Sequence, residues 1–480
     1  MQRTRFLVAS STFFLSLACS AQTASTPPAA KSEAPAASSA PVRASAAQEP
    51  AKEPIVWTQS ELEAMSSEIQ AQVAALRGAE FKRPVAVRLA NKDEFFAYAK
   101  KRQDMTETPA KIEADETLAK LLGVFPPELD LMATTMEFLK DQVGGFYDPS
   151  DDSFSLMDQC PKGVARIVLA HELGHALDDQ LFSIDSRQEE LSKNTDAAYA
   201  YHSVVEGSGT SVMIQWAVQH MSEIGDSMAG MAEMQEDANA SMAKAPMWLW
   251  KPLIAVYLQG AAFLGRTSNL MMGQTGGAKN ADIDAAFANP PRSMEQVLHP
   301  EKYWNAEKRD EPVGVAFDAS KLEDGWEVLR EDTFGEFLLA ILATPPAQRT
   351  SPDFTNPTAM LAMKLTNDIG RGWGGDRVAL LGKGKARYAR LVTRWDSARD
   401  AAEFYGAMSV LVGDLQASAK TLAARAGEPT AEEKDAKLES GADVEYGEDD
   451  VEVTIAIWSR VPQRERKMLE KRLAWTVGAQ

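Results

Sequence analysis

The sequence predicts an α+β protein that is mainly helical, on three observations. Segments with apolar residues three and four apart dominate residues 56–345, a few short strand-like segments lie between them, and from about residue 374 the pattern changes to paired strands around one helix. The chain has 480 residues, 45% hydrophobic and 25% charged, which is enough for two or three domains or one large core. We therefore expect a helical domain over 56–345 and a small α+β region over 346–480.

The N-terminus is typical of an export signal. Two arginines precede an apolar run that is too short to span a bilayer. The run ends in SLAC, so residues 1–19 resemble a bacterial lipoprotein signal with Cys19 as the lipidated residue. Ser16 stands where such signals usually have leucine, which leaves a plain secretory signal cleaved near Ala18 or Ala21 as the alternative.

Residues 20–55 predict a disordered tether between this signal and the folded part. They are rich in Ala, Pro, Ser and Glu and contain almost no large apolar residue. Ser20, directly after Cys19, is typical of sorting to the outer membrane in diderm bacteria. We therefore expect an exported protein, held at the outer membrane or in the periplasm-facing envelope by the lipid on Cys19.

The charge and the cysteine content limit the partners and the cross-links. A net charge of -19 argues against nucleic acid as a partner, because phosphate binding needs clustered Lys and Arg. The chain has two cysteines, and if Cys19 is lipidated, Cys160 is left alone. We expect no disulfide within the chain, so that the folded part relies on its core.

The local patterns place the elements from Trp57 onward. Thr58 or Ser60 is expected to cap the first helix, and Asn91 a later one. In chain order the patterns predict a helix from about 58 to 78, a strand in 84–90, helices in 91–102 and 132–143, a hairpin in 144–157, helices at about 163–182 and 195–222, a mobile Met-rich helix or lid at 223–245, a buried helix in 252–265, a Pro-punctuated loop at 289–304, a helical segment at 320–343, strands in 376–382 and 386–395, a helix in 397–415, an acidic insertion at 426–450, and a strand in 450–461.

The stretch VLAHELGHALDDQ, residues 168–180, carries the most specific chemistry. His171 and His175 are four apart and share one helix face, at a separation suited to a single zinc ion. Glu172 is close enough to reach a water on that ion without ligating it. This HExxH arrangement supplies two ligands and the general base of a zinc hydrolase. The alternative is a pair of ordinary helix histidines, but the surrounding apolar residues predict burial, where two imidazoles and a carboxylate are costly without a metal or partners.

A catalytic zinc needs a third protein ligand. Glu206, 31 residues after His175 on the next predicted helix, is the candidate. Gly207 and Gly209 beside it are expected to let the two helices approach closely. His202, one turn earlier, is a competing ligand, and a simple ion pair between Glu206 and an arginine is the structural alternative.

The motif resembles the active helix of gluzincins, the thermolysin-like zinc metallopeptidases. HELGHALDD matches that helix, including an acid where Asp179 stands. In the class, a glutamate on a following helix is the third ligand, as Glu206 would be here, and an aspartate follows it by four, where this chain has Thr210. Asp179 and Thr210 would then be candidates to orient the ligands.

A closer resemblance is to a group of exported bacterial and archaeal zincin-like proteins. That group carries GFYDP, an HExxH helix ending in DQ, an EGD-A-T stretch and PPxSTEQVLHPEKY. This chain has GGFYDP, HELGHALDDQ, EGSGT and PPRSMEQVLHPEKY, and departs from the pattern at Ser208, Gly209 and Met294. The resemblance covers most of residues 55–460.

The resemblance implies two further roles and a function. The GGFYD strand before the active helix would pair with an extended substrate backbone. His299 or Tyr303 would stabilise the oxyanion, although His299 is equally compatible with a capped loop histidine before Pro300. We expect a Zn²⁺-dependent metallopeptidase acting on peptide or protein substrates in the bacterial envelope, with Glu172 as general base. A catalytically silent zinc-binding lipoprotein and a metal-free peptide-binding protein are the alternatives.

Overall fold

The computed structural model describes residues 9–11, 57–106, 108–139, 142–148, 153–191, 193–224, 236, 238–322, 325–428, 434–447, 449–472 and 475–479. The predictions about Cys19 and the 20–55 tether lie outside these residues, as does most of the Met-rich segment at 223–245. Within them the protein is a mixed α+β structure, as the sequence predicts.

The first half of the chain is mainly helical. Thr58 caps the first helix reciprocally with Glu61, and the Asn91 side chain accepts from the Glu94 backbone N–H, as expected. The elements are β1 Ala9–Ser11, α2 Gln59–Arg77, β2 Ala86–Ala90, α3 Lys92–Thr106, α4 Pro109–Leu121, α5 Leu131–Leu139, β3 Val143–Asp148, β4 Ser153–Met157, α6 Lys162–Phe182, α7 Ile184–Leu191, α8 Thr195–Gln219, α9 Met221–Ile224, α11 Met247–Leu264, α12 Leu270–Gly273, α13 Asn280–Ala288, α14 Met294–Leu298 and α15 Glu301–Trp304.

The second half is built around a larger sheet. Its elements are β5 Val313–Phe317, η2 Ala319–Lys321, β6 Glu327–Asp332, α16 Gly335–Leu342, η3 Pro346–Gln348, α17 Pro357–Leu361, β7 Trp373–Lys383, β8 Ala386–Trp395, α18 Ala398–Arg425, β9 Leu438–Tyr446, β10 Glu452–Pro462, α20 Gln463–Arg472 and β11 Trp475–Ala479. The sheet order is β6-β7-β8-β10-β9, and every pairing in it is antiparallel. The long helix α18 packs on β9, β10 and β8.

A smaller sheet lies beside the helix that carries the HExxH motif. Its order is β1-β3-β4-β2, with β3 and β4 antiparallel, as the hairpin pattern predicts, and β2 parallel to β4. The short β1 pairs antiparallel with β3, opposing Ala9 to Phe146. Since α6 packs on β1, β3 and β4, the sheet lies directly against the motif helix.

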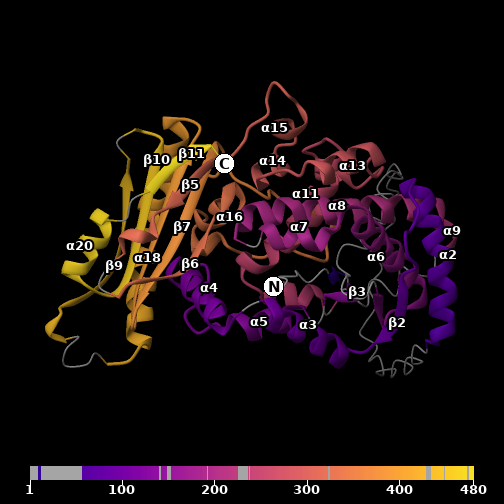
Figure 1. The fold of residues 1–480 in the computed structure, drawn as a ribbon, viewed down its shortest axis with the longest axis horizontal. Helices are drawn as coiled ribbons and strands as arrows, with labels where there is room; N and C mark the ends of the chain where they lie inside the picture. The colour runs from indigo at the N-terminus through magenta and orange to yellow at the C-terminus, as the bar shows by residue number, and fades with distance from the viewer. Residues whose placement is uncertain are drawn as a thin grey trace, which may run out of the picture.

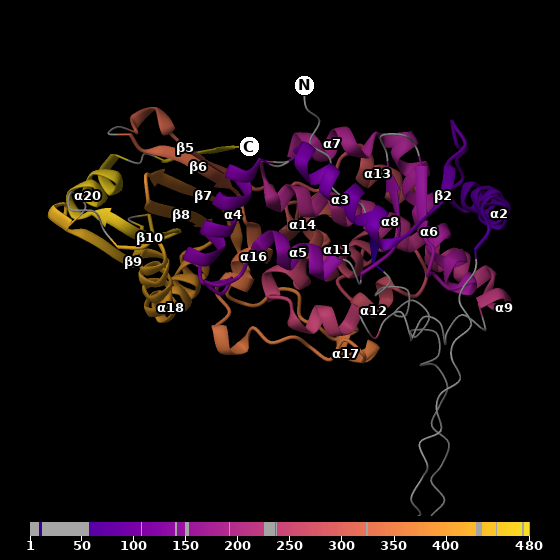
Figure 2. The same ribbon diagram turned by 90° about the horizontal axis from the view of Figure 1, so that it is seen from below.

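The two halves share one core. Figures 1 and 2 show the orange and yellow sheet unit at one end of the long axis and the magenta and purple helices beside it. A single cluster of buried apolar side chains runs from α4, α8 and α11 through α16 into β7, β8, β10 and α18. The expected domain boundary at residue 346 falls between β6 and β7, two neighbouring strands of one sheet, so the sheet begins before that boundary.

Three local predictions are wrong. The segment expected to be helical at 320–343 holds strand β6 before helix α16, and Gly335, with φ of +71°, allows the turn between them. The acidic insertion at 426–450 contains strand β9, which pairs with β10. The expected loop at 289–304 contains the short helices α14 and α15, the first capped by Ser293. In each case the local sequence pattern was weak, and strand pairing or helix capping determines the secondary structure.

Helix α11 is a buried helix, as predicted. Its side chains from Ile254 to Leu264 are buried, and Pro252 lies inside its first turns. Among the described residues, no helix combines the length and apolar character needed to cross a bilayer. The helix instead packs against α8, where Gly260 meets Gly207 so closely that a Cβ on Gly260 would lie 2.1 Å from the Ser203 carbonyl oxygen.

This contact gives a test of the packing. Gly260→Ala is expected to lower the free energy of unfolding by about 1–3 kcal/mol, because the added Cβ would clash with the α8 backbone and force α8 and α11 apart. The control is Gly413→Ala in the exposed face of α18, where a Cβ would meet nothing within 4 Å. It should raise stability by about 0.5–1 kcal/mol through helix propensity. Urea unfolding of both variants measures the difference, and equal effects would contradict the close α8–α11 contact.

Candidate metal centre

Helix α6 carries the two histidines and the glutamate of the motif into the interior. The helix is buried almost all round, with α2 on one side, β3 and β4 on another and α8 on a third. His171 and His175 are each 2% exposed and Glu172 is 0% exposed. The two imidazole rings meet edge to face, with centroids 4.4 Å apart. The predicted sharing of one helix face is therefore confirmed.

Helix α8 brings Glu206 to the same point. Glu206 Oε2 lies 3.2 Å from His171 Nε2 and 3.3 Å from His175 Nε2, while the two Nε2 atoms are 2.9 Å apart. Glu206 is itself 1% exposed. The three residues predicted to be metal ligands thus converge, although two belong to one helix and the third to another.

The spacing of these three atoms suits a zinc ion. In a tetrahedral site with bonds of about 2.0–2.1 Å, neighbouring donor atoms lie about 3.3–3.4 Å apart. The observed separations of 2.9 to 3.3 Å are close to this value. Two imidazole nitrogens and one carboxylate oxygen are also a donor set that zinc favours. Histidines that bind a metal usually donate a hydrogen bond from their other ring nitrogen, which orients the ring. Neither His171 Nδ1 nor His175 Nδ1 has such a partner within the described residues.

The electrostatics of the cluster favour the protonation states that a cation needs. Burial by itself would raise the pKa of Glu206, but the neighbouring His175 and His171 outweigh it and hold that pKa well below its usual range. Burial, followed by the neighbouring His171, lowers the pKa of His175. The Glu206 carboxylate therefore stays ionised beside the two imidazoles, which is the state in which it can bind a cation.

Glu172 lies beside this group on the same helix. Its carboxylate and the ring nitrogens of His171 and His175 each offer a ligand atom, and these atoms lie within 4.8 Å of one another. The Glu172 carboxylate is thus close to the two imidazoles that are predicted to hold the ion. This is the placement a general base requires.

His202 lies behind Glu206 and does not join the two motif histidines. Its Nε2 is 3.3 Å from Oε1 of Glu206, the oxygen that does not face His171 and His175. Its Nδ1 is 3.4 Å from Nε2 of the buried Gln188 on α7. Because an amide nitrogen can only donate, Nδ1 is the acceptor and Nε2–H donates to the carboxylate. Such a contact orients the Glu206 carboxylate and fixes which of its oxygens faces His171 and His175.

The glycines of the EGSGT stretch set the distances between helices. A Cβ on Gly209 would lie 2.7 Å from His175 Cε1 and 2.9 Å from His171 Cε1, so only glycine leaves room for both rings. Gly174 on α6 faces Gly209 across the same contact. Gly207 faces α11 and not α6. Gly209 therefore makes the predicted close contact between α8 and α6, and Gly207 makes a close contact between α8 and α11.

A buried ion pair holds α2, α6 and α8 together next to the centre. Arg77 binds Asp178 at 2.8 Å with both side chains buried, and Ser208 Oγ donates to Asp178 at 2.5 Å. Burial raises the pKa of Asp178, and Arg77 and Ser208 oppose that shift. The sequence favoured the adjacent Asp179 and Thr210 for supporting roles. Asp179 is partly exposed, and Thr210 Oγ1 has no hydrogen-bond partner in the part of the chain that is described.

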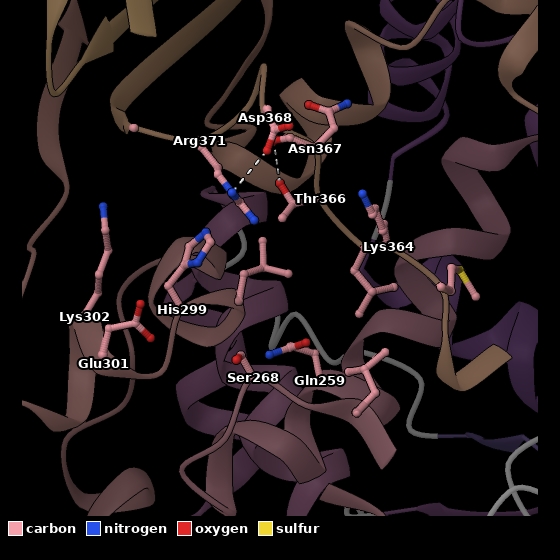
Figure 3. Close-up of a pocket in the computed structure, with 15 residues that line it drawn as sticks. Gln259, Ser268, His299, Glu301, Lys302, Lys364, Thr366, Asn367, Asp368 and Arg371 are labelled. Atoms are coloured by element: carbon pink, nitrogen blue, oxygen red, sulfur yellow. Dashed lines mark hydrogen bonds and ion pairs between the residues drawn. The ribbon is translucent and has the colours of Figure 1, made fainter. Parts of the chain in front are cut away.

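The two residues proposed to stabilise an oxyanion have other partners in this structure. His299 Nε2 lies 3.0 and 3.1 Å from the two oxygens of Glu336, and the residue lines a separate cavity (Figure 3). Tyr303 Oη donates to the Asn289 carbonyl at 2.5 Å, and its ring packs on Phe263. Among the described residues, neither His299 nor Tyr303 contacts His171, His175 or Glu206.

Two residues at the centre were not found from the sequence. Tyr257 of α11 stacks on His171 with ring centroids 5.9 Å apart, and Arg77 reaches the centre from the first helix through Asp178. Neither stands near the motif in the sequence. A weak signal for Tyr257 existed, because Gly260 three residues later marks the face of α11 on which another backbone approaches.

Comparison with known proteins bears on the other half of the chain. Residues 324–466 match a family model described as a domain of unknown function, DUF8575. No curated protein and no solved structure matches the chain. The matched segment contains the five-stranded sheet and α18, and it excludes every residue of the candidate metal centre.

The contact of His202 with Glu206 gives a test. His202→Ala should weaken zinc binding about 10- to 100-fold, because the carboxylate loses the donor that orients it. The control is His220→Ala at the end of α8, a histidine that packs on Trp216 and touches no predicted ligand. Competition with a chromophoric chelator measures both affinities. An unchanged affinity in His202→Ala would show that the contact does not support the ligand.

Proposed function

We propose that this protein is a zinc-dependent metallopeptidase that hydrolyses peptide bonds in the bacterial cell envelope. One observation carries the proposal. His171, His175 and Glu206, from two helices, place three ligand atoms within 3.3 Å of one another beside the buried Glu172. Such a set of buried ionisable groups is costly in a core unless it binds something. The zincin-like identity of the helical domain belongs to the same proposal.

Each residue then has a defined task. His171, His175 and Glu206 would hold the ion, and His202 would orient Glu206 from behind. Zinc at this position would supply a water activated near neutral pH and would polarise the scissile carbonyl. Glu172 takes the proton of the attacking water and delivers it to the leaving amine. Its burial raises the electrostatic strength of each of these interactions.

The edge of strand β3 supports a peptide as the substrate. Residues Ala9 to Ser11 pair with this strand as antiparallel β1 against residues 143–146. They belong to the expected signal, so its cleavage before Cys19 would leave this edge open to another extended segment. Strand β3 also packs on α6 beside the motif. An extended peptide bound in the same way would run past the motif helix and gain main-chain hydrogen bonds whatever its side chains are.

The cellular place of the reaction is also part of the proposal. The arginines and apolar run at the N-terminus and the SLAC sequence favour export and a lipid on Cys19. Such an anchor, followed by the 20–55 tether, would hold the enzyme at the envelope membrane near peptide or protein substrates.

A catalytically silent zinc-binding protein is the second candidate. The observation that favours it is the enclosure of the centre, since His171, Glu172, His175 and Glu206 are all at most 2% exposed. Structural zinc sites are closed, whereas catalytic sites keep one position open for water and substrate. The peptidase proposal therefore requires an opening movement that the silent protein does not.

The decisive experiment compares zinc content and peptide cleavage in the same preparations. The wild type should bind about one zinc per chain and cleave casein or a peptide library, and a chelator should abolish cleavage reversibly. Glu172→Gln should keep the zinc and lose about 10²- to 10⁴-fold in kcat, because only the base is removed. The control Glu190→Gln, an exposed glutamate of α7 paired with Arg187, should behave as wild type.

The outcomes separate the candidates. Zinc bound with no cleavage by the wild type would favour the silent protein. Cleavage that survives in Glu172→Gln would contradict the assignment of the base. A wild type that binds no zinc would overturn both metal-dependent functions.

A further inference from the structure

A second site for a small molecule is indicated by a cavity outside the metal centre. The cavity has a volume of about 700 Å³, within the range of small-molecule sites, and is open to solvent. Its lining comes from three segments, at 259–270, 298–302 and 363–372. The third segment belongs to the part of the chain that matches the family model, and the first two do not. None of the predicted zinc ligands lines it.

The floor of the cavity carries an imidazole oriented by a buried carboxylate. Glu336 on α16 is 0% exposed and accepts from Thr366 Oγ1 at 2.5 Å as well as from His299 Nε2. Because a carboxylate accepts hydrogen bonds, Nε2–H of His299 is committed to Glu336 whether the ring is neutral or charged. No hydrogen bond of His299 Nδ1 is found within the described residues. In the neutral ring this nitrogen carries a lone pair, which can accept a hydrogen bond from an O–H or N–H group of a ligand.

The rim of the cavity carries cations. Arg371 pairs with Asp368 at 3.1 Å, but these side chains are 60% and 86% exposed, so water and salt weaken the pair. Lys364 is exposed on the same segment. Figure 3 shows His299, Arg371 and Lys364 around the hollow, with the polar side chains of Ser268 and Gln259 on its opposite side.

One nearby charge is already neutralised. Lys302 also lines the cavity, but its ammonium is bound by Glu295 at 2.7 Å, Asp310 at 2.7 Å and Asp396 at 3.2 Å. These three acids form a cluster of metal-ligand type, and the lysine occupies its centre. Neither the lysine nor these three acids are therefore available to a ligand. Arg371, Lys364 and His299 remain as the binding groups, with the exposed acid Glu301 also in the lining.

We propose that this cavity binds a small molecule that carries both an oxyanion, a carboxylate or a phosphate, held by the rim cations Arg371 and Lys364, and an O–H or N–H group that donates to His299 Nδ1. Arg371 offers a planar pair of donors that fits either anion, and Lys364 adds a mobile positive charge. The Glu336 contact fixes the imidazole ring, so its Nδ1 is held in place before the ligand arrives. The amide of Gln259 and the hydroxyl of Ser268 suit a ligand with further polar groups. The site is independent of the proposed peptidase reaction, since it shares no residue with it.

Calorimetric titration of the full-length chain tests the proposal. The probes are inorganic phosphate and N-acetyl-alanyl-alanine, which carries a free carboxylate, and the tighter of the two identifies the head group. At least one should bind saturably. Arg371→Gln should weaken its binding at least 10-fold, and so should His299→Gln, checked for folding by its melting curve. Because Arg371 is exposed, its variant keeps the test valid if the histidine variant fails to fold.

Two controls separate the cavity from general charge and from the metal centre. Arg399→Gln removes an arginine of α18 that is 83% exposed and paired with Glu403, outside the cavity, and it should leave binding unchanged. Glu172→Gln should also leave it unchanged. No saturable binding of either probe would overturn the proposal. So would an equal loss in Arg371→Gln and Arg399→Gln, or a loss in Glu172→Gln.

Discussion

The close contact of α6 with α8 is the constraint on which the candidate centre depends. The two imidazoles on α6 can supply only two ligands, and a zinc site needs a third protein ligand from another element. Gly209 allows α8 to approach until the Glu206 carboxylate touches both rings. On the far side of α8, the Gly207 and Gly260 contact fixes the helix against α11. The geometry of the centre is thus set by backbone packing.

The buried carboxylates of Glu206 and Asp178 beside this contact have polar partners, whereas Nδ1 of His171 and of His175 has none within the described residues. Glu206 has imidazoles on both of its oxygens, and Asp178 has Arg77 and Ser208. An unpaired charge in such a place would cost several kcal/mol. The arrangement also explains why α2, although distant in sequence, belongs to the centre: its last turn provides the arginine that neutralises the aspartate next to the motif.

The sequence predicted the centre better than its surroundings. The i, i+4 spacing of His171 and His175 is a property of one helix, so it could be predicted without knowing the fold. Glu206 followed from its neighbouring glycines and from the resemblance, and the structure brings it to the pair. The sequence favoured Asp179 to orient the ligands, but the aspartate that is buried beside the motif is its neighbour Asp178, paired with Arg77. A shift of one residue turns a side chain by about 100° around a helix, and only the position of α2 shows which acid is buried.

For the fold too, elements with local sequence signals were predicted, and elements formed by contacts between distant segments were not. The helices that begin after Thr58 and Asn91 and the 144–157 hairpin carry their signals within a few residues and were predicted. Strand β9 is formed by pairing with β10 inside an acidic segment, and β6 by pairing with β7, so neither has a strong local signal. The contact of His299 with Glu336 likewise joins α14 to α16 and could not be read from either segment alone.

The central claim is that His171, His175 and Glu206 bind one zinc ion. Crystals of the protein grown with zinc, with diffraction data collected on both sides of the zinc absorption edge, test it directly. The account predicts a single strong anomalous peak about 2.0–2.2 Å from the two Nε2 atoms and from an oxygen of Glu206. A peak held by His202 or His299, or no peak between α6 and α8, would contradict it.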